Sequence, residues 1–243
     1  MKFSTYKDIA ERVECERLAR EDIVHFARDC KDYKDKEIAA IIISWLSDGE
    51  KEEKEYAISD VILNKMGGKP YDYIMSGDYT IYKDNYYCLH RMITYNEFAN
   101  LCEKLHSIYV RGITLQDAML EEKRRNGYGH YVTALASLLS GDTMIATAHV
   151  GANYRLNLAI RWLVRQDSPV DMGLWLQCSP SKLLVSVNAN TLQNIKKYAI
   201  LRSCDCNETT VISLTQFAKK IFPNDAARLD YVLNYNWFTN GSK

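Results

Sequence analysis

Residues 151–203 read GANYRLNLAIRWLVRQDSPVDMGLWLQCSPSKLLVSVNANTLQNIKKYAILRS. This segment holds seven basic and two acidic side chains, whereas the whole chain of 243 residues has a formal net charge of zero. A basic segment in a neutral chain indicates an anionic partner, and nucleic acid is the first candidate. The alternative, which charge alone favours, is a solvated pair of helices that happens to be basic.

The composition predicts a globular cytoplasmic protein. With 47% hydrophobic residues the chain can bury a sizeable core. The longest apolar run, residues 38–46, is too short to cross a bilayer, and the N-terminal residues lack the apolar region of a signal peptide. The seven cysteines are scattered and read as reduced thiols, and their spacing fits a structural zinc site poorly. We therefore predict no membrane segment, no metal and no cofactor.

Apolar residues recur at helical spacing along most of the chain. Residues 35–46 predict a central core helix, and 51–66 predict the next one. Thr94 and Glu97, and then Thr114 and Asp117, have the spacing of a capping box at the start of two further helices. Strand signals are few. The sequence therefore predicts an all-α fold, a bilobal helical bundle, with residues 1–243 as one domain or as two lobes with a cleft.

Two smaller patterns bear on function. Residues 153–165 predict a helix in which Arg161 and Arg165 share a face, and residues 188–190 lead into a second helix that carries Lys196 and Lys197. Six tyrosines lie between residues 70 and 87. Tyrosines can stack on unpaired bases, but such a cluster more often packs loops onto a core, and we expect packing.

The segment Arg155–Trp175, RLNLAIRWLVRQDSPVDMGLW, followed by SPSKLL and a basic helix, carries a resemblance. It resembles a bacterial family of uncharacterised proteins that looks like a divergent branch of the helix-hairpin-helix (HhH-GPD-like) DNA glycosylases. The resemblance extends more weakly over most of the chain. It implies a hairpin-like core segment at 151–203, a base flipped into a pocket, a catalytic aspartate and, in bifunctional members, a lysine that forms a Schiff base.

The chain departs from that pattern at the positions that would do the chemistry. Tyr154 stands where the family has lysine, Asn188 where it has the aspartate, and Asn190 at its histidine-like position. An amide cannot supply a negative charge to a cationic sugar or act as a general base. Asp171 remains as a candidate substitute acid, although we consider pairing with Arg161 or Arg165 its more common role.

Three hypotheses follow. The first is a DNA-binding relative of the glycosylases that is non-catalytic or catalytically diverged. The second is an active glycosylase or lyase that uses a substitute acid such as Asp171. The third is a helical protein-interaction module without DNA binding. The first predicts that DNA is contacted by a set of basic and amide side chains in the 151–203 segment: Arg155, Arg161, Arg165, Lys182, Asn188, Asn190, Lys196 and Lys197.

Overall fold

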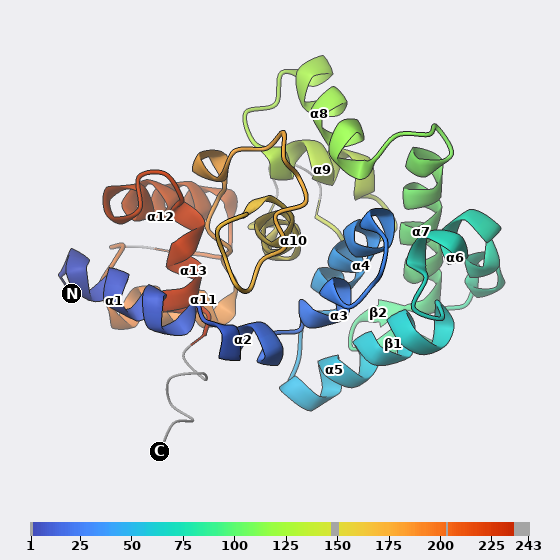
Figure 1. The fold of residues 1–243 in the computed structure, drawn as a ribbon, viewed down its shortest axis with the longest axis horizontal. Helices are drawn as coiled ribbons and strands as arrows, with labels where there is room; N and C mark the ends of the chain where they lie inside the picture. The colour runs from blue at the N-terminus through green and yellow to red at the C-terminus, as the bar shows by residue number, and fades with distance from the viewer. Residues whose placement is uncertain (1, 147–150, 203, 236–243) are drawn as a thin grey trace. The chain divides into compact units, whose positions relative to one another are not determined.

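The structure, a computed structural model, describes residues 2–146, 151–202 and 204–235. These residues are organised almost entirely as helices, with one two-stranded sheet, so the prediction of an all-α fold is confirmed (Figure 1). Within them no helix combines the length and the apolar character needed to cross a membrane. The chain divides into two compact units, which we describe separately. Unit 1 is Met1–Asp22 with His149–Lys243, and unit 2 is Ile23–Ala148.

Unit 2 holds seven α-helices in its described residues, with short π, 3-10 and strand segments among them. The helices are α3 (His25–Arg28), α4 (Tyr33–Trp45), α5 (Lys51–Ser59), α6 (Pro70–Ser76), α7 (Tyr95–Tyr109), α8 (Leu115–Asn126) and α9 (Tyr131–Leu139). The other elements are the π-helix η1 (Asp60–Lys65), the 3-10 helix η2 (Asp78–Tyr82), and the strands β1 (Cys88–His90) and β2 (Ile93–Thr94).

The core of unit 2 is built around α4. Every residue from Ile38 to Leu46 is buried, because a helix that is apolar on all sides must be covered on all sides. Helices α3 and α6 pack against it. The indole N–H of Trp45 donates to the carbonyl of Thr143 at 2.6 Å, which satisfies its polar atom inside the core. The predicted central helix at 35–46 is therefore confirmed.

Two helix starts were readable from the sequence because they depend only on local contacts. Thr94 at the start of α7 and Thr114 at the start of α8 both form complete capping boxes with the third residue of the helix. Helix α8 has a second cap from a distant residue. Both oxygens of the buried Glu37 accept backbone N–H groups of its first turn at 3.0 Å. The capping boxes confirm the prediction. The contact of Glu37 with α8 was not predicted, because Glu37 is distant from that helix in the sequence.

One predicted helix has an irregular end. The sequence predicts a single helix over 51–66, but α5 ends at Ser59 and continues as a π-helix from Asp60 to Lys65. The wider turn brings side chains five residues apart toward one face, and the Lys65 ammonium group lies 2.5 Å from the Asp60 carboxylate. This ion pair is a physical reason for the irregularity that helical periodicity could not reveal.

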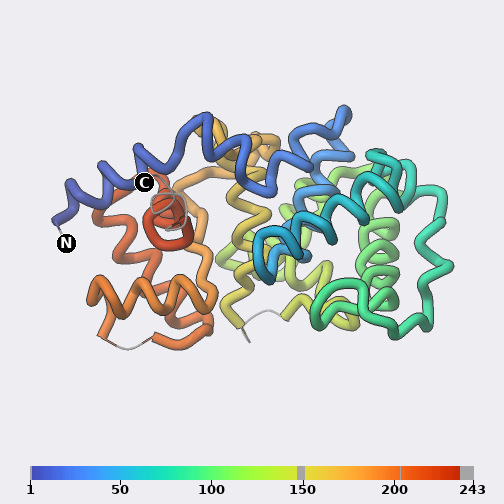
Figure 2. Tube along the Cα trace, turned by 90° about the horizontal axis from the view of Figure 1, so that it is seen from below, coloured from blue at the N-terminus to red at the C-terminus, as the bar shows by residue number. Residues whose placement is uncertain are grey.

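Unit 1 combines the first helices of the chain with its last part. Its elements are α1 (Phe3–Val13), α2 (Glu16–Glu21), α10 (Tyr154–Val164), the 3-10 helix η3 (Pro180–Lys182), α11 (Ala189–Lys197), α12 (Glu208–Ile221), the 3-10 helix η4 (Ala226–Arg228) and α13 (Leu229–Leu233). Helix α13 packs against α1 and α11, and the ribbon of Figure 1 and the tube of Figure 2 both place the blue N-terminal helix beside the red segment that contains α13. Segments from both ends of the chain therefore share this core.

Candidate nucleic-acid interface

Helix α10 and its C-cap residue Arg165 carry three of the eight predicted DNA contacts, but two of these side chains, Arg161 and Arg165, point into the core of unit 1. Arg161 and Arg165 share a face, as their spacing predicts, and their side chains are only 0% and 3% exposed. The helix is apolar on nearly all sides, so every residue from Leu156 to Val164 is buried. The structure contradicts the prediction that these two arginines face DNA, because Arg161 is fully enclosed and Arg165 exposes only an edge, with both guanidinium groups bound by carboxylates.

Arg161 is enclosed by two carboxylates and two aromatic rings. Its Nε donates to Asp171 Oδ1 at 3.2 Å, and its Nη1 donates to Asp230 Oδ2 at 3.4 Å. Its Nη2 donates to the Tyr235 hydroxyl at 2.9 Å, and the guanidinium carbon lies 4.8 Å from the centre of the Tyr231 ring. The donors of this buried cation thus have partners from α13, from its flank and from the loop after α10.

Arg165 extends the same network, and we call the whole group the buried ion network. Its guanidinium group donates to Asp171, to Asp225 Oδ2 at 2.7 Å and to Glu14 Oε1 at 2.6 Å. The Tyr231 hydroxyl accepts from Arg165 at 3.0 Å and donates to Asp171 Oδ2 at 2.8 Å. The network therefore joins α10 to the end of α1 and to the segment that contains η4 and α13.

Charge and burial compete in this network. Burial alone would lower the pKa of Arg161, but the Asp171 charge holds that pKa well above its ordinary value. Burial raises the pKa of Asp230 to about 6, against the opposing effects of Arg161 and the Ser186 N–H. Because a buried charge without a partner costs several kcal/mol, these groups stabilise unit 1 only as a set. The expectation that Asp171 pairs with Arg161 or Arg165 is confirmed for both.

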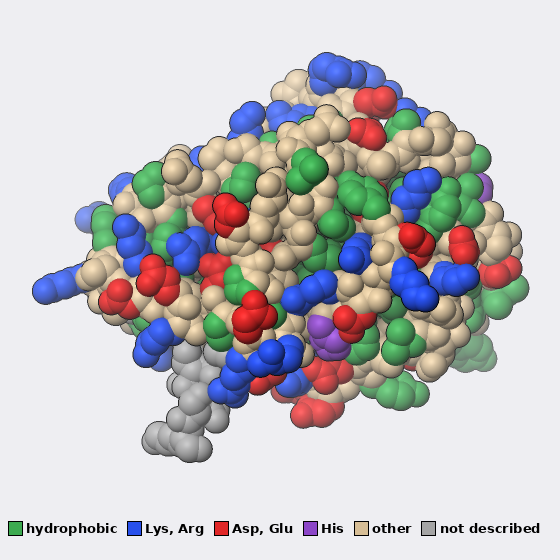
Figure 3. All heavy atoms as spheres, viewed as in Figure 1, with side chains coloured by type: hydrophobic (Ala, Val, Ile, Leu, Met, Phe, Trp, Pro, Cys, Tyr) green, Lys and Arg blue, Asp and Glu red, His purple; other side chains and the backbone are tan. Residues whose placement is uncertain are grey.

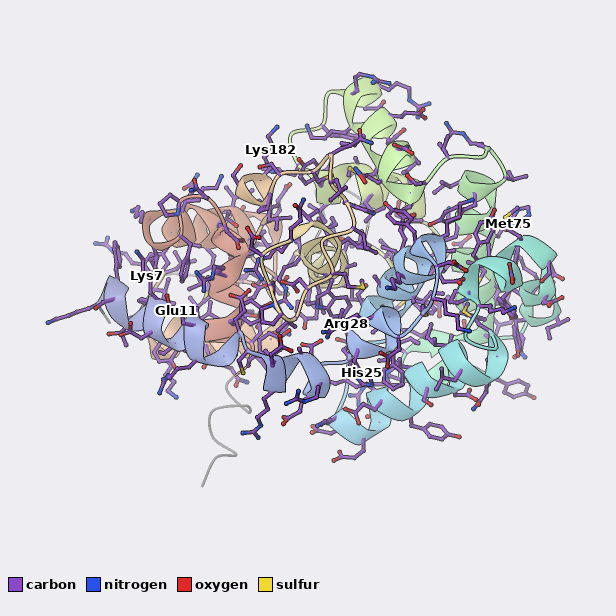
Figure 4. All side chains as sticks on the ribbon, viewed as in Figure 1. Lys7, Glu11, His25, Arg28, Met75 and Lys182 are labelled. Carbon is purple, nitrogen blue, oxygen red and sulfur yellow. The ribbon has the colours of Figure 1, made fainter. Side chains whose placement is uncertain are left out.

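The other predicted contacts lie closer to the surface. Lys182, which Figure 4 labels, is exposed on η3, and Asn190, Lys196 and Lys197 are exposed on α11. Arg155 is half-buried at the start of α10. On the face seen in Figure 3, basic and acidic side chains alternate, as a net charge of zero leads one to expect. A basic surface for DNA must therefore be sought on individual elements of residues 151–203 and not on this face as a whole.

The two positions that depart from the glycosylase pattern both lie at helix starts. Tyr154 is the first residue of α10 and is half-buried. Asn188 is the N-cap of α11, where its side-chain oxygen accepts the backbone N–H of Thr191 at 2.9 Å. Asp171, by contrast, lies within the buried ion network. The structure thus brings Asp171 together with Arg161 and Arg165, and gives Asn188 a capping role.

A groove of about 500 Å³ lies at the edge of the buried ion network. Arg165, Asp225, Asp167 and residues 179–181 contribute to its wall. Asp167 is exposed there, and Arg165 is already bound by carboxylates. A groove with these acids would repel a phosphate, so the surface of α11 is the better candidate interface. In the described part of the chain, no group of three or more His, Cys, Asp or Glu residues could hold a metal ion.

Comparison with known families gives one result. Residues 22–236 match a family described as a protein of unknown function, DUF2400. The chain belongs to the DUF2400 family. Searches of curated proteins and of solved structures found no match. The DUF2400 match covers Asp171, Asp225 and Asp230 but begins after Glu14, so one carboxylate of the buried ion network lies outside it. Membership confirms the likeness to a family of unknown function, and the further likeness to the glycosylases stays a prediction.

Proposed function

We propose that this DUF2400 protein binds DNA through α11 of unit 1 and does not excise bases. It would be a relative of the helix-hairpin-helix glycosylases in which the catalytic lysine and aspartate are replaced by Tyr154 and Asn188. Four features support this proposal: the exposed face of α11, the charge of the 151–203 segment, the N-cap of α11 and the pairing of Asp171 with two arginines.

The exposed face of α11 carries the proposal. Thr191, Asn194 and Ile195 are buried, whereas Asn190, Gln193 and the Lys196–Lys197 pair are exposed and recur at helical spacing. The helix has no acidic residue. Amide side chains hydrogen-bond bases and phosphates, and lysines neutralise phosphates, so this face has the chemistry of a nucleic-acid contact.

The charge of the 151–203 segment also supports DNA binding after the two buried arginines are set aside. In the described part of residues 151–203, five basic side chains remain exposed or half-buried, against one exposed acid, Asp167. The five are Arg155, Lys182, Lys196, Lys197 and Arg202. Counterion release by such a set is the main source of affinity for a polyanion.

The N-cap of α11 supports the absence of catalysis. Asparagine and aspartate cap a helix about equally well, so Asn188 keeps the local fold that an aspartate would have there while removing the charge. Asp171 is a poor substitute, because its two oxygens accept from Arg161, Arg165 and the Tyr231 hydroxyl. The Asp171 side chain is also 0% exposed, so neither oxygen is available to a sugar or to an attacking water.

Charge reversal on α11 tests the proposal. We expect Lys196→Glu combined with Lys197→Glu to weaken binding of a fluorescent DNA duplex by about tenfold or more at moderate salt. Lys219→Glu with Lys220→Glu is the matched control, because this exposed pair also occupies the last turn of a helix, α12. Equal losses from both variants would show that only net charge matters, and unchanged affinity in the first would refute the interface.

A lesion panel tests the second half of the proposal. Duplexes that carry oxidised, alkylated or deaminated bases are incubated with the protein, and released bases and strand breaks are measured. We expect binding without release. Release that persists in purified protein and is lost in Asp171→Asn, with the fold intact, would instead support a glycosylase that uses Asp171.

A further inference from the structure

Unit 2 presents an apolar surface that the proposed DNA contact does not use. In the described part of the chain, six large apolar side chains are at least 70% exposed, and five of them lie between residues 56 and 92. Four belong to α5 and to the hairpin formed by β1 and β2 with its flanks, and we call these four the apolar patch. They are Tyr56, Tyr86, Tyr87 and Met92, at 77%, 70%, 81% and 79% exposure.

The tyrosine cluster therefore divides into two groups. Tyr73 and Tyr79 are buried, Tyr82 stacks on Tyr95 at 5.0 Å between ring centres, and Tyr71 packs edge-on against Tyr109. The expectation that the cluster packs onto the core is confirmed for these four. It is wrong for Tyr86 and Tyr87, which are exposed although each ring could bury a large apolar area.

The hairpin contacts both α5 and the loop that precedes it. Arg91 Nη1 donates to Glu53 Oε2 at 2.8 Å, and the His90 ring Nε2 donates to the Asp48 carbonyl at 2.7 Å. Gly49 leaves room for the first contact, since a Cβ there would lie 2.9 Å from Glu53 Oε2. Strand β1 packs beside α5, and hydrophobic side chains reach the surface in this region in Figure 3.

Tyr56 and Met92 each lie close in sequence to one member of the Arg91–Glu53 ion pair. Tyr56 lies three residues after Glu53 on α5, which places both on one face of the helix. Met92 follows Arg91 at the turn of the hairpin. Tyrosine and methionine are both enriched at protein interfaces, and tyrosine is common among the residues that dominate binding energy.

The charge around the patch decides between a protein and a nucleic acid. Residues 48–56 and 84–92 contain six acidic and three basic side chains. The acids are Asp48, Glu50, Glu52, Glu53, Glu55 and Asp84, and the bases are Lys51, Lys54 and Arg91. The neighbouring pairs Lys65–Asp60 and Lys83–Glu103 are each neutral. An excess of three acids repels phosphates and attracts lysine and arginine.

We propose that the apolar patch binds a protein partner in which apolar side chains are flanked by lysine or arginine. The apolar side chains of the partner cover the tyrosines and Met92, and its cations approach the acidic rim. This surface lies on unit 2 and is independent of α11, so the failure of one proposal leaves the other standing.

A phage-displayed library of random peptides, selected on the purified full-length protein, tests the chemistry of the partner. We expect enriched peptides to combine aromatic or aliphatic residues with lysine or arginine, and their binding to weaken as salt rises. Enrichment of acidic peptides, or no enrichment at all, would overturn the proposal.

The location is tested with two thiols of the same chain. Cys88 is exposed in β1 within the hairpin, and Cys206 is exposed in unit 1. A synthetic copy of the enriched peptide should slow alkylation of Cys88, measured by mass spectrometry, and leave Cys206 unchanged. Protection of Cys206 alone would place the site elsewhere. Equal protection of Cys88 by a single-stranded oligonucleotide would assign the patch to nucleic acid instead.

Two substitutions complete the test. Met92→Ser should weaken peptide binding by about tenfold, because it removes one of the four exposed apolar side chains that form the patch. Leu176→Ser is the matched control, since Leu176 is also 72% exposed but lies in unit 1. Both side chains are on the surface, so both variants should fold normally. Equal effects of the two substitutions, or none from Met92→Ser, would refute the assignment of the patch.

Discussion

Replacement of Asp171 by asparagine should destabilise unit 1 strongly. The Asp171 carboxylate accepts from Arg161 at 3.2 Å, from Tyr231 at 2.8 Å and from Arg165. Asparagine has nearly the same shape as aspartate but no charge. Its NH₂ group would also face groups that themselves donate hydrogen bonds, namely Arg161, Arg165 and the Tyr231 hydroxyl. Arg161 would keep only Asp230, at 3.4 Å, as a charged partner. Removal of one partner from a buried ion pair costs about 3–5 kcal/mol, and we expect a loss of that size.

Urea unfolding followed by fluorescence measures this loss, since Trp162 and Trp175 are both buried in unit 1. The midpoint should fall while the slope is retained. Hydrogen exchange should show that the lost protection lies in α10 and α13. The control is Asp167→Asn, which makes the same chemical change at an exposed position of the same segment and should cost less than about 0.5 kcal/mol. A loss below about 1 kcal/mol for Asp171→Asn would refute the reasoning about the network.

Two further predictions concern the same unit. Burial raises the pKa of Asp230 from 3.8 to about 6, so its contribution to stability is complete below the lower value and is lost as pH rises toward the upper one. The stability advantage of the wild type over Asp230→Asn should therefore shrink between those values, and urea midpoints that differ by a constant amount would contradict this. Gly173→Ala should cost at least about 2 kcal/mol, because φ is +61° and a Cβ would lie 2.6 Å from the Cα of Gln166. Gly127→Ala, at φ +66° with open space, should cost only about 1 kcal/mol, and equal losses in thermal unfolding would argue against the clash.

The sequence predicted the local features of this fold best. Helix α4 and the two capping boxes depend on residues a few positions apart, and all three are confirmed. The π-helix after α5 was not predicted, because the spacing of apolar residues does not distinguish it from an α-helix. The feature that accompanies it is a single ion pair, Lys65–Asp60. The hairpin tyrosines were misjudged, since composition cannot show which members of a cluster reach the core.

The candidate site was predicted only in part. The shared face of Arg161 and Arg165 follows from their spacing, but the direction of that face depends on Glu14, Asp225 and Asp230, which are distant in sequence. One feature of the sequence of α10 did indicate that its arginines are buried. Residues 156–164 are apolar on nearly all sides of the helix, so an arginine among them is expected to be buried with acids as partners.

The most direct test of the central claim is the salt dependence of affinity for an undamaged DNA duplex. If the five exposed or half-buried cations of residues 151–203 contact phosphates, the logarithm of the association constant should fall linearly with the logarithm of salt concentration. The slope for a duplex is about −0.9 for each phosphate contact, which gives about −3 to −4.5 if three to five of these cations make contact. A slope in this range, reduced by about 2 in the Lys196→Glu and Lys197→Glu variant, is the result we predict. Absent binding, or affinity that does not change with salt, would contradict DNA binding by this protein.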